Sequence, residues 1–289
     1  MVGRLVALLE RASTRGCHLV VFPELALTTF FPRWWFDDIA DIDTFFETEM
    51  PSVHTEPLFA AARRLGIGFC LGYAERVVVG GRVRRFNSSV LVAPSGRIVG
   101  RYRKIHLPGH ADHRPTWPTQ HLEKRYFETG DLGFRVDRVF GGWIGMAICN
   151  DRRWPETYRV LGLQGVEMVL IGYNTPAVDA EAPELDRLAS FHNRLVMQSG
   201  AYQNGTWVVG VAKAGCEEGV QHIGDSVIIA PSGEVMACTT TLDDELTVAP
   251  CDLDATRIYK TTIFDFARHR EPGAYRLIAD RRGAGPPAN

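Results

Sequence analysis

The chain has 289 residues, of which 45% are hydrophobic, and its 32 basic residues are nearly balanced by 34 acidic ones. The net charge of −2 offers no electrostatic footprint for nucleic acid or for an anionic membrane surface. The six cysteines form no CxxC pair, no secretory signal is recognised, and no apolar run approaches the roughly 20 residues of a membrane span. We therefore expect a cytoplasmic protein with one α/β domain and no disulfide framework.

The N-terminal segment is typical of an amphipathic helix over residues 2–15. Leu5, Leu9 and Ala12 recur at helical spacing, and Gly16 suits the position just after a helix. Apolar runs bounded by turn residues predict the next elements: a buried strand at 18–22, a helix at 56–65, and strands at 67–78, 85–93 and 96–104.

One hairpin pattern occurs twice. SVLVAPSGRIVGRY at 89–102 and SVIIAPSGEVMACT at 226–239 both join two apolar strands through a Pro-Ser-Gly turn. Proline supplies the first dihedral of such a turn, and glycine supplies the position with positive φ. The repetition predicts two similar sheets, although independent use of the same turn chemistry explains it equally well.

The second half alternates helices and strands after a long polar connection at 105–132, which has the length of a functional loop. The expected elements are a helix at 155–164, a strand at 166–174, a helix near 185–203, a strand at 206–213, and an extended arm with a short helix at 254–282. This alternation favours mixed sheets with helices outside, in one domain over 1–282, followed by a disordered tail at 283–289.

The stretch GGWIGMAICNDRRWPE at 141–156 joins a buried strand to a helix, and Cys149 lies at the junction. A thiol on such a turn faces a helix N-terminus, which together with nearby cations favours the thiolate. Cys149 is therefore a candidate nucleophile, and a buried structural cysteine is an equally good interpretation of its position.

Two more polar residues directly follow apolar strands. Glu24 comes after HLVVFP and Lys104 after IVGRYR, and catalytic groups in such sheets gather at the C-terminal ends of strands. A carboxylate in an apolar setting has a raised pKa and can accept a thiol proton, while a lysine beside it can stabilise an oxyanion. A simple Glu–Lys ion pair at the edge of the sheet is the structural alternative.

Other catalytic chemistries are disfavoured. His106, His110 and His113 do not predict a metal site, because Pro108 and Gly109 break the helix that would bring their imidazoles together. The chain also has no GxSxG, phosphate-loop or GxGxxG motif, which argues against serine hydrolases and nucleotide-dependent enzymes.

The segments around Glu24, Lys104 and Cys149 resemble the Glu-Lys-Cys triad of the nitrilase superfamily: FPELALTTFFP, YRKIHLPG and ICNDRRWPE. Within that superfamily the chain is similar to N-carbamoyl-D-amino acid amidohydrolases, over about residues 5–280. This finer resemblance rests on FPELALTTFFPRW, RKIHLPGH, QHLEKRYFETGDLGF, CNDRRWPE, GYNTP, SFH and YQNG.

The resemblance implies a four-layer αββα sandwich, homodimers that often pair into tetramers, and a reaction without a metal or other cofactor. It implies that Cys149 attacks the ureido carbonyl carbon of a carbamoyl amino acid. Glu24 would take the thiol proton and later activate water, and Lys104 and the backbone N–H of Asn150 would hold the oxyanion. Glu123 matches a second acidic residue near the triad, with an exposed loop position as the alternative.

The resemblance also assigns residues to the substrate pocket. Arg152 is expected to bind the substrate carboxylate through two parallel hydrogen bonds, and Arg153 to form a surface salt bridge or to support Arg152. The other expected pocket residues are Asn174, Thr175, His106, His121 and His192. The histidines have structural hydrogen bonding as an alternative.

The expected activity is hydrolysis of an N-carbamoyl-D-amino acid to the D-amino acid, ammonia and carbon dioxide through a covalent cysteine intermediate. The alternatives are a β-ureidopropionase-like or aliphatic amidase activity and a non-catalytic relic. The relic is considered because the resemblance implies a further N-terminal strand, roughly 20 residues long, whose absence would expose the edge of its neighbour.

Overall fold

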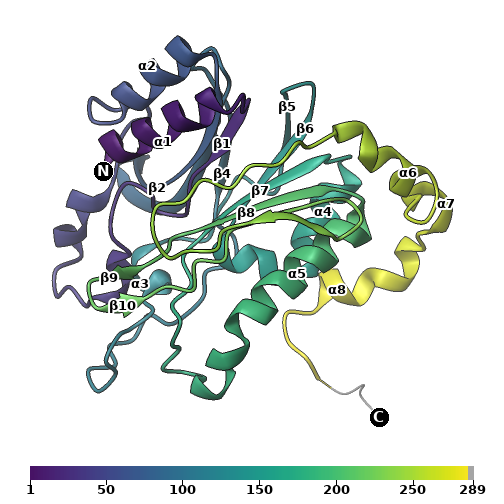
Figure 1. Ribbon diagram of the computed structural model, residues 1–289. Coiled ribbons are helices and arrows are strands. Elements are labelled where there is room, and N and C mark those ends of the chain that lie inside the picture. The colour runs from purple at the N-terminus through teal and green to yellow at the C-terminus, as the bar shows by residue number, and fades with distance from the viewer. Residues whose placement is uncertain (286–289) are drawn as a thin grey trace.

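Two β-sheets pack face to face, and helices cover the outer face of each (Figure 1). This arrangement is the expected four-layer αββα sandwich. The computed structural model describes residues 1–285, so residues 286–289 of the predicted 283–289 tail lie outside the described part.

The first sheet has the strand order β1-β2-β3-β4, with β1 parallel to β2 and the other pairs antiparallel. Its strands are β1 (Leu19–Val21), β2 (Gly68–Val79), β3 (Arg82–Val92) and β4 (Ile98–Arg103). Helices α1 (Val2–Thr14) and α2 (Glu56–Leu65) pack on its outer face through a buried apolar cluster that includes Leu9, Phe59 and Leu71.

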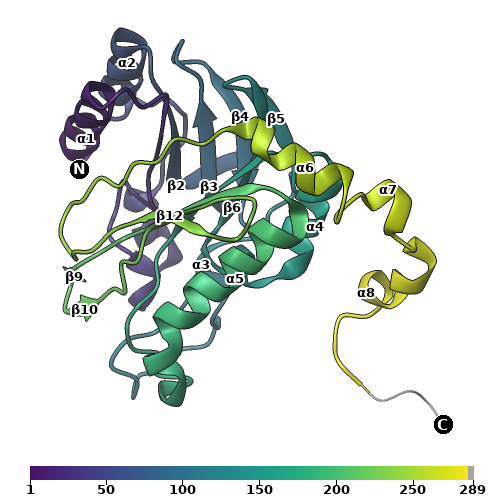
Figure 2. The same ribbon diagram turned by 45° about the vertical axis from the view of Figure 1, so that its right-hand side comes forward.

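The second sheet has the order β12-β11-β8-β7-β6-β5, in which β6, β7 and β8 are parallel. Its strands are β5 (Val136–Val139), β6 (Gly142–Ile148), β7 (Met168–Tyr173), β8 (Trp207–Ala212), β11 (Val227–Ile229) and β12 (Val235–Cys238). Helices α4 (Pro155–Leu163) and α5 (Ala189–Asn204) cover its outer face (Figure 2). Its inner face shares a core with the first sheet, in which Leu91 and Ile148 take part.

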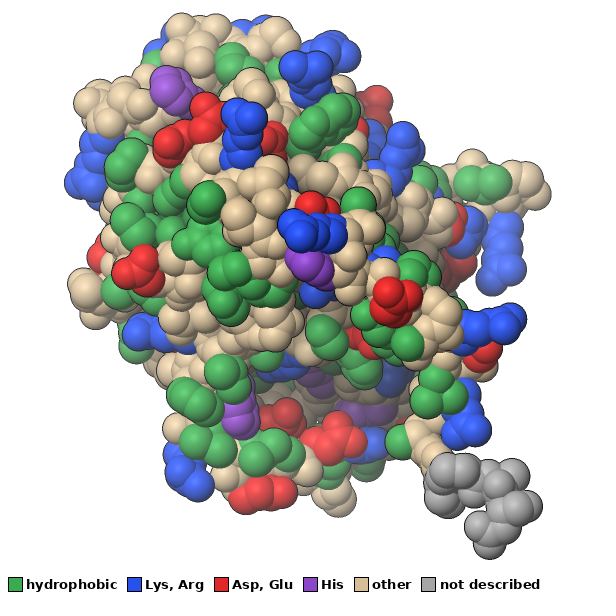
Figure 3. Space-filling view, turned by 90° about the vertical axis from the view of Figure 1, so that its right-hand side faces the viewer, with side chains coloured by type: hydrophobic (Ala, Val, Ile, Leu, Met, Phe, Trp, Pro, Cys, Tyr) green, Lys and Arg blue, Asp and Glu red, His purple; other side chains and the backbone are tan. Residues whose placement is uncertain are grey.

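The short elements are α3 (Glu123–Tyr126), β9 (Cys216–Glu217), β10 (Val220–Gln221), α6 (Thr256–Thr261), α7 (Phe266–His269) and α8 (Arg276–Asp280). The last three form a C-terminal arm that leaves the body of the molecule (Figure 2), where the sequence predicted one short helix. On the face drawn in Figure 3, acidic and basic side chains are interspersed among hydrophobic ones. Within residues 1–285, no helix combines the length and the hydropathy that crossing a bilayer requires.

The two Pro-Ser-Gly hairpins become β3–β4 and β11–β12, one at an edge of each sheet, which confirms the prediction of two similar sheets. Their turn glycines, Gly96 and Gly233, have φ values of 76° and 87°. The helix predicted near 185–203 begins later, at Ala189, because Pro183–Leu188 forms 3-10 turns. Strand β5 was not predicted, since four residues are too few to show an alternating pattern.

Glycines on both sheets make room for the backbone that carries Glu24. A Cβ atom on Gly72 of β2 would lie 2.7 Å from the carbonyl oxygen of Pro23 and 2.8 Å from Cα of Glu24. On Gly172 of β7 it would lie 2.6 Å from the backbone nitrogen of Glu24. No side chain fits at such distances, so the segment after β1 is held between the two sheets only because both positions are glycine.

We expect Gly172→Ala to displace the Glu24 backbone, to lower the free energy of unfolding by about 1–3 kcal/mol and to reduce hydrolytic activity. Gly3→Ala in α1 is the control, because nothing lies within 4 Å of its added Cβ. Urea denaturation measures both effects. An unchanged unfolding midpoint for Gly172→Ala would contradict the close approach.

Candidate active site

Cys149 lies on a strained turn directly after β6. Its φ of 47° places a residue other than glycine in the left-handed region. Asp151 stabilises the turn, because its Oδ2 accepts hydrogen bonds from the Ile148 backbone N–H at 2.9 Å and from the Tyr102 hydroxyl at 2.8 Å. The predicted strand-to-helix junction is therefore present, but a 3-10 turn over Cys149–Arg153 separates β6 from α4.

The Arg152 guanidinium is buried and is bound to protein groups through all three nitrogens. Nη1 donates to the Cys149 carbonyl at 2.8 Å and lies 3.8 Å from Sγ. Nη2 donates to Thr175 Oγ1 at 2.8 Å, and Nε donates to Asn193 Oδ1 at 2.9 Å. The guanidinium also lies over the Tyr173 ring, 4.2 Å from its centroid. These contacts hold the Cys149 turn and differ from the expectation that Arg152 faces the substrate.

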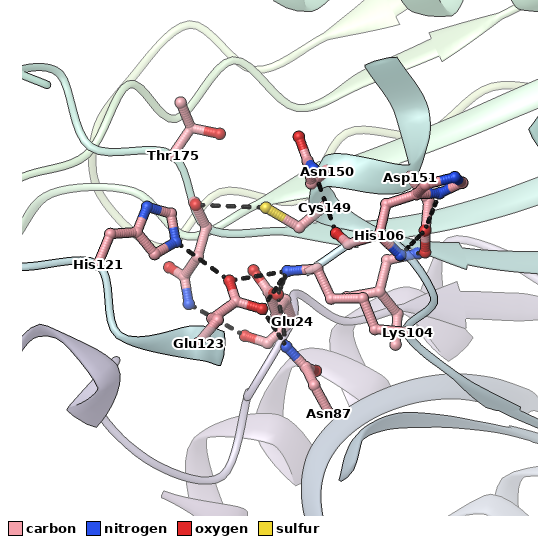
Figure 4. Close-up of polar contacts among 12 residues, drawn as sticks. Glu24, Asn87, Lys104, His106, His121, Glu123, Cys149, Asn150, Asp151 and Thr175 are labelled. Carbon is pink, nitrogen blue, oxygen red and sulfur yellow. Dashed lines mark hydrogen bonds and ion pairs between the residues drawn. The ribbon is translucent and has the colours of Figure 1, made fainter. Parts of the chain in front are cut away.

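Three charged side chains meet beside Cys149 and are 0% exposed (Figure 4). Lys104, just after β4, donates from Nζ to Glu24 Oε1 at 2.7 Å and to Glu123 Oε1 and Oε2 at 2.8 and 2.6 Å. Glu123 is the first residue of α3 and is buried, so the exposed-loop alternative for it is wrong. The structure thus brings together Glu24, Lys104 and Cys149, which the sequence analysis proposed because each follows an apolar strand. Glu123 joins them as a second acidic residue.

The two glutamates have different proton affinities. Burial raises the pKa of Glu24, and the charge of Lys104 offsets this only in part. Burial also acts on Glu123, but Lys104 and His121 outweigh it and lower its pKa. Neighbouring groups whose pKa values are pushed apart are typical of acid–base sites. Glu24 is therefore suited to take up a proton, while Glu123 stays ionised as a counter-charge for Lys104.

The surroundings of Cys149 favour the thiol over the thiolate, opposite to the direction expected from the helix N-terminus and nearby cations alone. Burial raises the pKa of Cys149 and the charge of Glu24 adds to this, which outweighs the opposite effect of Lys104 and Arg152. The thiol donates to the carbonyl oxygen of Asn174 at 3.5 Å. A nucleophile has to be generated by proton transfer, and Glu24 Oε2, which has no hydrogen-bond partner among the described residues, is available to accept that proton.

A cavity of about 510 Å³ opens onto Cys149. The expected site residues in its wall are Cys149, Arg153, Asn174, Thr175, His121 and His192. The loop before α3, the loop before α5 and the segment around Phe30 and Arg33 contribute most of the rest of the wall, together with Val220 and His222 at the β9–β10 hairpin. His121 links the wall to the buried ion cluster, since its Nε2 lies 3.2 Å from Glu123 Oε1.

Arg153 lines the cavity in place of Arg152. Its Nη1 donates to Asn150 Oδ1 at 3.2 Å, a neutral partner. Arg153 is exposed on the cavity side. Desolvation by the neighbouring wall and the charge of Arg152 lower its pKa, so an anion in the cavity would stabilise its charged form. The structure therefore separates two arginines that the sequence could not tell apart.

His106 does not line the cavity, in contrast to the expectation from sequence. Its Nδ1 lies 2.8 Å from Asp151 Oδ1, and its backbone N–H donates to the same oxygen at 3.0 Å. Its carbonyl accepts a hydrogen bond from Asn150 Nδ2 at 3.2 Å. His106 thus holds the chain next to the Cys149 turn. Its role is structural hydrogen bonding, the alternative that the sequence left open for it.

Among the polar residues that sequence reasoning missed, Asn87 contacts the ion cluster, and Asp151 and Asn193 support the Cys149 turn directly or through Arg152. Asn87 was detectable in principle, because it lies four residues before Leu91 on β3 and so shares its inward face. A buried polar residue on the inner face of a strand needs a partner, which is the signal that was overlooked.

The αββα sandwich with a cysteine, a lysine and two glutamates buried together is the arrangement of a hydrolase that uses a thiol nucleophile. The chain belongs to the carbon–nitrogen hydrolase family, whose model matches residues 1–261. Enzymes of this family hydrolyse carbon–nitrogen bonds of amides, and we assign the chain to that class.

Known relatives support this assignment. The chain is 32% identical over 250 residues to a nitrilase of Pyrococcus abyssi, covering 86% of this chain and 82% of that protein. It is 28% identical over 288 residues to the N-carbamoylputrescine amidase of Arabidopsis thaliana, covering 96% and 89%. Its fold matches a carbon–nitrogen hydrolase from Helicobacter pylori G27 with a TM-score of 0.82 at 23% identity, over 97% and 93% of the two chains.

We expect Glu24→Gln to separate turnover from thiol reactivity. Turnover should fall by about 10²–10⁴-fold, because a general base is lost. Alkylation of Cys149 by iodoacetamide at neutral pH should not slow, because removal of the Glu24 charge lowers the pKa of the thiol. Mass spectrometry locates the label, and Glu10→Gln, at an exposed ion pair with Arg64, is the control. Retained turnover in Glu24→Gln would exclude Glu24 as the base.

Proposed function

We propose that the protein hydrolyses N-carbamoyl-D-amino acids to the D-amino acid, ammonia and carbon dioxide. The observation that carries the proposal is the Arg153 guanidinium in the wall of the cavity that opens onto Cys149. A planar guanidinium binds a carboxylate through two parallel hydrogen bonds. A carbamoyl amino acid places its carboxylate two bonds from the ureido nitrogen, so one ligand can reach both groups.

The reaction begins with transfer of the Cys149 proton to Glu24. The sulfur then forms a bond to the ureido carbonyl carbon, and the carbonyl electron pair moves to the oxygen. Lys104 Nζ and the backbone N–H of Asn150 stabilise that oxyanion. As the carbonyl re-forms, one nitrogen leaves and takes the proton from Glu24. Water, deprotonated by the same carboxylate, attacks the thiocarbamate carbon, the carbon–sulfur bond breaks, and the Cys149 thiolate takes the proton back from Glu24. The resulting carbamic acid decomposes to an amine or ammonia and carbon dioxide.

The remaining wall residues orient the substrate. Asn174 and Thr175 follow β7 and offer an amide and a hydroxyl to the ureido group and the carboxylate. His121 and His192 lie on the cavity wall, where their ring nitrogens can form hydrogen bonds with the substrate. In this scheme Arg153 binds the substrate, while Arg152 keeps the nucleophile in place. The D-configuration rests on the sequence resemblance around CNDRRWPE and GYNTP.

A carbamoylated amine is the second candidate substrate. Asp179, Glu181 and Asp186 contribute to the cavity wall and would favour a distant cation. The relative from Arabidopsis thaliana is named N-carbamoylputrescine amidase. Such a substrate has no carboxylate for Arg153, so the two candidates predict opposite effects of removing that charge.

We further infer that the protein works as a homodimer or homotetramer, as the resemblance implies, and that it is cytoplasmic, as its scattered cysteines without a CxxC pair favour. Phe191 and Leu195, one turn apart on α5, are 59% and 48% exposed. An exposed apolar helix face of this kind supports a contact between copies of the chain.

The test of the proposed substrate is hydrolysis of paired N-carbamoyl-D- and L-amino acids and of N-carbamoylputrescine, with ammonia release as the measurement. We expect turnover of the D-carbamoyl acids. Preferential turnover of the carbamoyl amine would replace the first candidate by the second. A chelator is expected to leave the rate unchanged.

Arg153→Ala is expected to raise KM for carbamoyl acids by about 10–100-fold, because a hydrogen bond to a charged group contributes about 1.5–3 kcal/mol. KM for neutral amides should change little. Arg153→Lys should be intermediate, since lysine cannot bind a carboxylate with a planar pair of donors. Arg187→Ala, an exposed arginine outside the cavity wall, is the matched control. Equal effects on acids and neutral amides would remove the carboxylate-binding role.

A further inference from the structure

Asn87 is the one neutral side chain that contacts both buried glutamates, among the residues the structure describes. Its Nδ2 donates to Glu24 Oε1 at 2.7 Å and lies 3.4 Å from Glu123 Oε2 (Figure 4). Its backbone carbonyl oxygen accepts a hydrogen bond from the backbone N–H of Lys104 at 2.8 Å. Asn87 is completely buried. A single residue of β3 therefore contacts all three members of the ion cluster.

The orientation of the Asn87 amide is set by its neighbours. Carboxylate oxygens only accept hydrogen bonds, so the amide nitrogen has to face them and the amide oxygen has to face away. In that orientation Asn87 Oδ1 is buried without a hydrogen-bond partner among the described residues. Buried polar atoms are seldom left in this state. Oδ1 therefore stays without a hydrogen bond while Nδ2 donates to Glu24.

The donors on Glu24 are distributed unequally between its two oxygens. Oε1 accepts from both Asn87 and Lys104 at 2.7 Å. Oε2 is buried and has no partner among residues 1–285. Two donors on one oxygen fix the rotation of the carboxylate and leave the other oxygen as the basic one.

We propose that Asn87 is a positioning residue that holds Glu24 so that Oε2 takes up the proton from Cys149 and later from water. This inference rests on the proposed function. Asn87 does not touch the substrate, since it is absent from the cavity wall. Its hydrogen bond also stabilises the ionised form of Glu24 and lowers the pKa of that carboxyl group, against the effect of burial. Loss of Asn87 therefore raises the pKa of Glu24, so that the carboxylate needed as the base forms only at a higher pH.

The test compares Asn87→Ala with Asn204→Ala. Asn204 is a matched control because it is also buried, donates one hydrogen bond, to the Gly200 carbonyl at 2.9 Å, and has an unpartnered Oδ1. It lies at the end of α5, outside the ion cluster. For Asn87→Ala we expect kcat to fall about tenfold, KM to stay the same, and the acid limb of the kcat/KM profile to move to higher pH. Asn204→Ala should lower Tm without moving that limb.

If Asn87→Ala does not fold, Asn87→Leu is used for the same measurement of the acid limb, because leucine keeps the side-chain volume without a hydrogen-bond donor. The pH profile of Cys149 alkylation by iodoacetamide is measured in parallel, because it depends on the thiol and Glu24 and needs no carbamoyl substrate. If the wild type hydrolyses none of the carbamoyl compounds but this profile moves in the Asn87 variants, the proposed function fails and the role of Asn87 stands. An acid limb that stays at the wild-type pH in both assays overturns the role of Asn87, whatever the change in Tm or kcat.

Discussion

The site depends on one buried ammonium group shared by two carboxylates. Lys104 forms hydrogen bonds with Glu24 and Glu123 where all three side chains are 0% exposed. Removing one partner of such a buried pair costs about 3–5 kcal/mol, because it leaves an uncompensated charge. One cation cannot compensate the charges of two carboxylates in full. Glu123 makes the closer, bidentate contact and stays ionised, so the excess proton affinity falls on Glu24, beside the thiol. The asymmetry of the cluster thereby creates a base from an ordinary glutamate.

The geometry of the two sheets turns this charge distribution into a reactive site. Glu24 reaches the core because Gly72 and Gly172 let its backbone pass between the sheets. Cys149 meets it from the second sheet on a turn with φ of 47°, and Leu25, the residue after Glu24, has the same φ. Two residues with positive φ, one the nucleophile and one next to Glu24 in the chain, are consistent with a site held in position by the surrounding core rather than by local preference. Arg152 and Asp151 supply the hydrogen bonds that keep the nucleophile turn in this conformation.

The sequence predicted the elements whose apolar patterns are long, such as α1, α2 and the two Pro-Ser-Gly hairpins, since burial imposes those patterns directly. It also pointed to Glu24, Lys104 and Cys149, because the ends of buried strands collect polar groups. It could not separate Arg152 from Arg153. Neighbouring residues diverge by about 100° in an α-helix and 120° in a 3-10 turn, and only the tertiary contacts show which of the two faces a cavity. The protonation of Cys149 was also out of reach, because the burial that opposes the thiolate is a property of the assembled core.

The charges around the cavity limit which substrates the proposed reaction can accept. Arg153 lies four residues beyond Cys149, whereas the acidic residues of the wall, Asp179 and Glu181, belong to the loop before α5. Glu181 is 3.6 Å from Arg114, so its charge is partly compensated at the surface. A carboxylate next to the carbamoyl group would therefore meet a cation, while a second carboxylate at the far end of the ligand would meet like charge. The same wall contains Val178 and Leu185. For the proposed carbamoyl amino acid substrate, this wall favours apolar or basic side chains and disfavours acidic ones.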